Sequence, residues 1–218
     1  MEMHRRSLER YGHPDIAVWA GEPHGAGAEW LLDYVESSVA AGTRFAAGDT
    51  VQAGWVTVMI EDAEPGLLEV MEPDFASMPV AWVPGARNTL RFLMIQQEVC
   101  RQAGVDSDHA SMLHPAAISP GFLANPPAFR LSRESDHGKL AGWQCRESGD
   151  GGGERTLCSL YQVACSVPAI IPFMGLPPGA IVAVREDAIE IAAGGRTVSS
   201  RENEFLRQLL QSAFLRRG

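Results

Sequence analysis

The stretch VQAGWVTVMI, residues 51–60, decides the fold class, because β-branched residues dominate it. It predicts a strand in which Gly54 forms a bulge. The following residues 61–66, EDAEPG, predict a turn. Residues 67–71 then predict a second strand, and residues 80–83 a short third one. The first half of the chain therefore contains antiparallel β structure.

Two helices are predicted around these strands. The clearer one is NTLRFLMIQQEVCRQA, residues 88–103, whose apolar residues recur at helical spacing and which ends before Gly104. Residues 28–40 show the same spacing and stop before Gly42. Strands in hairpins combined with amphipathic helices predict an α+β fold.

The chain is expected to divide into two small lobes, each a mostly antiparallel sheet with packed helices. Residues 106–127 are rich in Ser, Ala, Pro and Asn without a sustained period, which is typical of a linker. We therefore expect one lobe in residues 1–105 and another in 128–218. The elements expected in the second lobe are strands at 128–131, 140–146, 180–185 and 188–192, and helices at 157–167 and 201–215.

Composition restricts the partners and the compartment. The net charge is −9 and the pI is about 5.1, which argues against nucleic-acid or anionic-membrane binding, because phosphate groups require clustered cations. The charged start, residues 1–6, is not followed by an apolar run, so we expect no signal peptide. The apolar stretch 156–184 contains four prolines, which argues against a membrane helix. A cytoplasmic location is expected.

The cysteines Cys100, Cys145, Cys158 and Cys165 form no C-x-x-C pair and are expected to be free thiols. Cys158 and Cys165 would share a helix face if residues 157–166 were helical. Cys100 lies on the inner face of the helix 88–103, which favours packing over a role as a nucleophile.

No motif in the sequence defines a catalytic, metal or cofactor site. Asp106, Asp108, His109 and His114 are capable metal ligands, but no second ligand set accompanies them. The run Ser135-Asp136-His137 contains the residue types of a hydrolase triad without the G-x-S-x-G elbow. The glycine-rich run 149–153 lacks the Gly-Lys-Ser/Thr of a phosphate loop. We expect no catalytic residue, no metal and no cofactor.

The strongest functional signal is acidic. Residues 45–86 contain seven acids and neither Lys nor Arg. One interpretation is a solvated hairpin in an acidic protein, and the other is a negative surface that attracts a basic protein. Aromatic residues in the same stretch would then anchor the partner. The predicted partner-binding residues are Asp49, Trp55, Glu61, Asp62, Glu64, Glu69, Glu72, Asp74, Phe75 and Trp82.

A family resemblance concerns residues 128–185. It rests on Arg133-Glu134, on Ala141-Gly142-Trp143 before a Gly/acid-rich loop, and on a later segment, residues 168–179, that ends in Leu-Pro-Pro-Gly. These motifs resemble immunity protein family 33, although Ala141 stands where the family usually has Ser and the spacing from Arg133 to Trp143 differs. The resemblance implies an acidic intracellular protein, without catalysis, that occludes the site of a bacterial polymorphic toxin.

The function predicted from the sequence is therefore the binding of a protein partner, a basic toxin or effector domain. Two alternatives stay open. One is an enzyme whose site is assembled from scattered residues, and the other is an adaptor subunit of a larger assembly. A pocket lined by converging His, Asp or Cys would favour the enzyme, whereas an acidic surface with exposed aromatics would favour the binder.

Overall fold

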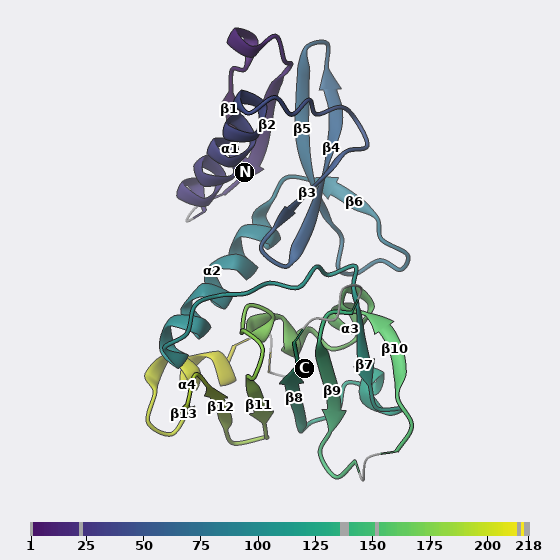
Figure 1. The fold of residues 1–218 in the computed structure, drawn as a ribbon, viewed down its shortest axis with the longest axis vertical. Helices are drawn as coiled ribbons and strands as arrows, with labels where there is room; N and C mark the ends of the chain where they lie inside the picture. The colour runs from purple at the N-terminus through teal and green to yellow at the C-terminus, as the bar shows by residue number, and fades with distance from the viewer. Residues whose placement is uncertain (1, 22–23, 136–139, 151–152, 213–214, 216–218) are drawn as a thin grey trace. The chain divides into compact units, whose positions relative to one another are not determined.

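The computed structural model describes residues 2–21, 24–135, 140–150, 153–212 and 215. It is an α+β protein with two sheets, and the chain divides into two compact units, residues 1–93 and 94–218 (Figure 1). The division lies within α2 (Arg87–Ala103) and not in the segment 106–127 that the sequence predicted as a linker. That segment belongs to the second unit, because one of its strands pairs with the second sheet.

The first unit is built on a six-stranded sheet. Five strands follow the order β1-β2-β5-β4-β3, and β6 pairs with β5. All neighbouring strands are antiparallel except β2 and β5, which are parallel. The strands are β1 (Glu2–Arg6), β2 (Asp15–Ala20), β3 (Thr50–Ala53), β4 (Val56–Glu64), β5 (Leu67–Pro73) and β6 (Trp82–Pro84), and a short 3-10 helix, η1 (Glu9–Tyr11), follows β1.

Helix α1 (Gly25–Ala40) packs beside β1 and β2 (Figure 1). It buries one apolar stripe at helical spacing: Ala28, Leu31, Leu32, Val35 and Val39. Alternate residues of the strands beneath it point toward the helix. The covered face of the sheet carries Ile16, Val18, Val58, Ile60 and Val70, which are fully buried.

The predicted strand at 51–60 is two strands. Gly54 has a φ of +65° and, with Trp55, connects β3 to β4 in a two-residue hairpin. Glycine at the first central position of such a turn matches the right-handed twist of the strands, so the predicted bulge at Gly54 was wrong. The predicted turn at 61–66 is shorter than expected, since β4 continues to Glu64 and only Pro65 and Gly66 form the turn.

The second unit is built on a seven-stranded sheet with the order β10-β7-β9-β8-β11-β12-β13. Only β7 and β9 are parallel. The strands are β7 (Pro115–Ile118), β8 (Phe129–Arg133), β9 (Trp143–Glu147), β10 (Thr156–Ser159), β11 (Ile181–Val184), β12 (Ile189–Ala193) and β13 (Arg196–Ser199).

Several helical elements accompany this sheet. They are the residues 94–103 of α2, then η2 (Phe122–Ala124), α3 (Leu160–Ser166), η3 (Pro168–Phe173) and α4 (Glu204–Leu210). Helix α2 is held to η3 by a hydrogen bond from Gln96 Nε2 to the carbonyl of Ile171, at 2.8 Å. The core contains large, fully buried side chains such as Trp143, Tyr161, Phe122 and Phe173.

Two predicted helices in this unit begin later than the sequence suggested. Residues 156–159 form strand β10, and Ser159 caps α3 by accepting a hydrogen bond from the Gln162 amide. Cys158 is therefore in a strand and shares no helix face with Cys165, which corrects that prediction. All four cysteines are free, as expected. The C-terminal helix starts at Glu204, because Asn203 caps it.

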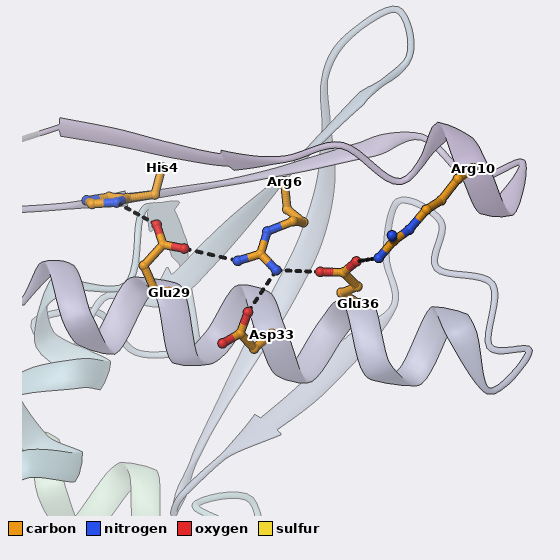
Figure 2. Close-up of polar contacts among 6 residues, drawn as sticks. All are labelled: His4, Arg6, Arg10, Glu29, Asp33 and Glu36. Atoms are coloured by element: carbon orange, nitrogen blue, oxygen red, sulfur yellow. Dashed lines mark hydrogen bonds and ion pairs between the residues drawn. The ribbon is translucent and has the colours of Figure 1, made fainter.

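An ion-pair network joins β1 to α1 on the covered face (Figure 2). Arg6 donates hydrogen bonds to Asp33 at 2.7 Å, to Glu29 at 3.0 Å and to Glu36. Arg10 also bonds Glu36, while His4 lies 3.2 Å from Glu29. The hydrogen bond from Arg6, helped by Arg10, holds the pKa of Glu36 below its ordinary value. The network connects β1 and η1 to α1 over residues 29–36.

We expect Glu36→Gln to lower the free energy of unfolding by about 0.5–1 kcal/mol at pH 7. A carboxyl whose pKa is depressed by folding stabilises the fold above its unfolded pKa of about 4.3 and loses that contribution as pH falls through the folded pKa. The difference from the unmodified protein should therefore vanish toward pH 3. Urea unfolding across this pH range measures it, with the exposed Glu64→Gln as control. A difference that persists unchanged at pH 3 would contradict the electrostatic account.

Candidate binding face

The face of the first sheet opposite α1 carries half-buried and exposed side chains, together with four buried ones, Ala17, Thr57, Leu67 and Pro73. The pairing register of the strands shows which side chains lie on this face, because directly opposed residues point to the same side of a sheet. Met3 is opposite Trp19, Glu61 is opposite Glu69, and Met59 is opposite Met71. We call this surface the open face, and it is formed by Met3, Arg5, Trp19, Met59, Glu61, Glu69, Met71, Trp82 and Pro84.

The helices of this unit pack on the other side of the sheet. His4 and Arg6 point toward α1, as Figure 2 shows. Because side chains alternate along a strand, Met3 and Arg5 point to the other face. Glu72 contacts the first turn of α2, and its neighbours Met71 and Pro73 belong to the opposite side. The open face therefore has no covering helix among the described residues of this unit.

Two carboxylates face each other across the open face. Glu61 and Glu69 are directly opposed on β4 and β5, an arrangement that destabilises a sheet because like charges repel. Trp19 Nε1 donates a hydrogen bond to Glu69 at 3.2 Å. The nearest cation on this face, Arg5, is paired with Asp15 at 2.7 Å. Among the described residues, neither glutamate forms an ion pair.

The apolar part of the open face consists of methionine and tryptophan. Met59 and Met71 are half-buried neighbours, and Met71 is next to Pro84 on β6. Trp19 and Trp82 are also half-buried, while Met3 is 43% exposed. Methionine and tryptophan are enriched in protein interfaces because they supply large, adaptable apolar contacts. The acids are thus surrounded by side chains of the kind that anchor a partner.

Three of the ten predicted partner-binding residues lie on the open face: Glu61, Glu69 and Trp82. Asp49 is exposed in the loop before β3, where its carboxylate accepts a hydrogen bond from the Ala46 amide at 2.8 Å. Asp62 and Glu64 are exposed at the end of the β4–β5 hairpin. Asp49 and Asp62 add to the negative charge of the unit without belonging to the open face. Glu64 is opposite Leu67 and so lies on the same side of the sheet as Glu69, but at the tip of the hairpin, beyond the residues that define the open face.

Asp74 and Phe75 have local roles. Asp74 organises the loop after β5, and a hydrogen bond from the Ser77 hydroxyl, with a second from the Ala76 amide, lowers its pKa. Phe75 is half-buried, with its ring 5.6 Å from Trp55 and 5.2 Å from Phe92. Phe75 therefore belongs to an aromatic cluster at the end of the sheet.

Two predicted partner-binding residues are buried, and these predictions were wrong. Trp55 is 1% exposed and packs against Phe75 and Phe92. Glu72 is 4% exposed, and its carboxylate accepts the backbone amides of Asn88 at 3.1 Å and Thr89 at 2.8 Å. It caps α2, where a negative charge compensates the free amides and the helix dipole.

The open face contains residues that the sequence analysis missed, namely Met3, Arg5, Trp19, Met59 and Met71. Strands β1 and β2 were not predicted, so nothing assigned Met3 or Trp19 to a sheet. The signal was present in part, since DIAVWA at residues 15–20 is a short apolar run of the kind that buried strands show.

The negative charge of the protein is concentrated in the first unit. Residues 1–93 contain 14 acidic and six basic side chains, a net charge of −8. Residues 94–218 contain 13 acidic and 12 basic side chains, a net charge of −1. Nearly all of the field that could attract a basic partner therefore originates in the unit that bears the open face.

The motifs of the family resemblance meet in the second unit around Arg133, whose side chain is 2% exposed. Its guanidinium donates to the carbonyl of Leu176 at 2.5 Å and to the Asp108 carboxylate at 3.0 Å, and it lies 5.7 Å from the ring of Trp143. The Gly179 amide bonds the Arg133 carbonyl at 2.7 Å. Segments that are far apart in sequence are thus held together by one buried cation.

The thiol and the histidine near this cation are both held in their uncharged forms. Cys100 donates its S–H to the Gly175 carbonyl at 3.2 Å, and burial raises the pKa of Cys100 to about 11. Burial also lowers the pKa of His109, with Arg133 adding to the effect. At neutral pH the sulfur is therefore a protonated thiol and the ring is neutral, which suits packing more than nucleophilic attack.

The remaining predictions about chemistry concern several separate segments. Asp108 is engaged by Arg133, and no group of three or more His, Cys, Asp or Glu side chains within the described ranges could hold a metal. Of Ser135-Asp136-His137, the last two lie outside the described residues, as do Gly151 and Gly152 of the glycine-rich run. In the described part of the chain, no helix is long and apolar enough to cross a membrane.

Comparison of the chain with protein-family models, with curated proteins and with solved structures gives no match. The resemblance to immunity protein family 33 therefore stays a prediction from the motifs.

The capping role of Glu72 predicts a large effect on stability. Glu72→Ala leaves the Asn88 and Thr89 amides without an acceptor, and we expect it to lower the free energy of unfolding by about 2 kcal/mol. Glu72→Gln keeps one acceptor oxygen and should have about half this effect. Urea unfolding measures both, with the exposed Asp62→Ala as control, which should change stability by less than about 0.5 kcal/mol. Equal effects of Glu72→Ala and Asp62→Ala would refute the capping role.

Proposed function

We propose that this protein is a cytoplasmic immunity protein that binds a basic toxin or effector domain through the open face of its first sheet. The observation that carries this proposal is the opposed pair Glu61 and Glu69 within a surface of methionine and tryptophan. A partner with Lys or Arg side chains would neutralise the two carboxylates on contact. The repulsion that the free protein tolerates would then become part of the binding energy.

The composition of the open face supports a protein partner over a small molecule. It is part of a pleated sheet surface, and its apolar side chains alternate with carboxylates instead of converging on an enclosed space. In a protein interface of this kind the tryptophan and methionine side chains supply contact area, and the carboxylates supply the electrostatic complementarity that orients a basic partner. The function requires no catalytic group in this chain, because covering the toxin's site is sufficient to inhibit it.

The charge distribution supports a positively charged partner. With a net charge of −8 on residues 1–93, long-range attraction would accelerate encounter with a basic domain. Asp49, Asp62 and Glu64, although outside the open face, contribute to this field. Their contribution should fall with added salt, because screening shortens its range to about 10 Å at 0.1 M.

The open face and its charge support protein binding, and the resemblance of residues 128–185 to immunity protein family 33 supports the immunity role in particular. It makes a separate genetic prediction: the gene for the toxin should lie beside the gene for this chain. A neighbouring open reading frame that encodes a basic toxin domain at its C-terminal end would supply the partner for binding measurements. Absence of any such frame would count against the immunity role while leaving protein binding to be tested with other partners.

We expect Glu61→Lys to slow association with the basic toxin domain about 10-fold at low salt. Glu61→Gln should slow it less, and should also raise the free energy of unfolding of the free protein by about 0.5 kcal/mol, because it removes the repulsion with Glu69. Surface plasmon resonance over a salt series measures the rates, and urea unfolding measures the stability.

Asp33→Asn provides the matched control. It removes one negative charge from α1, on the other side of the sheet, so it should change the association rate by less than about twofold. An association rate that responds equally to Asp33→Asn and Glu61→Gln would show only the effect of net charge. Unchanged binding by Glu61→Lys would refute the open face as the binding surface.

A further inference from the structure

Two arginines are directly opposed on the second sheet. Arg130 on β8 faces Arg146 on β9, and Ala183 on β11 is the other neighbour of Arg130 in the same row. Like charges at opposed positions destabilise a sheet. The free protein thus carries a repulsive pair of cations, although its total charge is −9.

The two arginines line a cavity of about 270 Å³. The turn after β9, with Ser148, Gly149 and Asp150, forms one side of it, and Val184 and Arg185 at the end of β11 form another. The volume is close to the lower end of ligand sites, which begin at roughly 300 Å³. It can hold the phosphate group and the organic part of a small phosphorylated molecule.

The acids near the cavity do not neutralise the opposed pair. Asp150 is paired with Arg155 at 2.9 Å, and Glu190 is paired with Arg185 at 3.0 Å. The carboxylate of Glu147 lies against Gly121, and Glu147 is opposite Phe129, so its side chain is on the other face of the sheet.

The opposed arginines have N–H groups that bond to no acceptor among the described residues. Arg146 uses one amino group to hydrogen bond Gln144 at 2.6 Å, and its Nε is buried with no partner among the described residues. Arg130 is exposed and forms no hydrogen bond or ion pair within the described ranges. A buried N–H without a partner is costly, and an anion that accepts from it would remove that cost.

We propose that this cavity binds a small molecule through its phosphate group, which is held by Arg130 and Arg146. Two guanidinium groups match the charge of a phosphate dianion, and their planar sets of donors fit its oxygens better than a single carboxylate. Binding would convert the repulsion between the arginines into attraction to a shared anion. The site belongs to the second unit and does not depend on the partner-binding function of the first.

Isothermal titration calorimetry tests the site with two probes, inorganic phosphate and glycerol 3-phosphate, at an ionic strength kept constant with sodium chloride. We expect each probe to bind once per chain, and Arg130→Gln or Arg146→Gln to weaken binding at least about 10-fold, since each removes a charge-assisted contact. Arg201→Gln is the control, because it makes the same charge change outside the cavity, where Arg201 pairs with Asp187. It should leave both affinities unchanged.

Stability of the free protein gives a second, independent readout. Arg130→Gln should raise the midpoint of urea unfolding, because it removes the repulsion with Arg146. An arginine pair with a purely structural role would give the opposite sign. The proposal is overturned if neither probe binds at about 10 mM, if the two cavity variants bind both probes as tightly as the Arg201→Gln control does, or if Arg130→Gln lowers the unfolding midpoint.

Discussion

The side chains of a strand alternate between the two faces of a sheet, and in the first unit only one face is covered by helices. This constraint sorts the acidic stretch 45–86 into side chains that build the fold and side chains that are free to bind. Glu72 points to the covered side and caps α2, whereas Glu61 and Glu69 point to the open face. Residues of the same type, a few positions apart, therefore have opposite roles.

Much of the fold follows from local patterns in the sequence. The spacing of apolar residues predicted α1 and α2, and the strands predicted at 180–185 and 188–192 correspond to the paired strands β11 and β12. Strand β13, which pairs with β12, was not predicted. The α+β class, with two mostly antiparallel sheets, is confirmed. What local patterns missed is long-range pairing. Strand β2 pairs in parallel with β5, about fifty residues later, and no local signal in residues 15–20 specifies that neighbour.

The same distinction explains the fate of the predicted site. Trp55 was predicted as an anchor because it is an aromatic residue in an acidic stretch, but the glycine before it creates a hairpin that turns its ring into the core. The open face could not be assembled from residues 45–86 alone, because Met3 and Trp19 come from strands outside that stretch. In the second unit, the motif residues Arg133, Trp143 and Leu176 pack around the buried guanidinium of Arg133. Their contacts are therefore explained by the fold and need no binding function.

Oxidative footprinting with hydroxyl radicals tests the central claim most directly, because methionine and tryptophan are oxidised where solvent reaches them. The measurement compares the free protein with its complex with the toxin domain. The account predicts protection in the complex of the open-face residues Met3, Trp19, Met59, Met71 and Trp82. Trp30 on α1 and Met94 on α2, which are 44% and 47% exposed, should be oxidised equally in both states. Protection of Trp30 or Met94, with oxidation of the open face unchanged, would contradict the account.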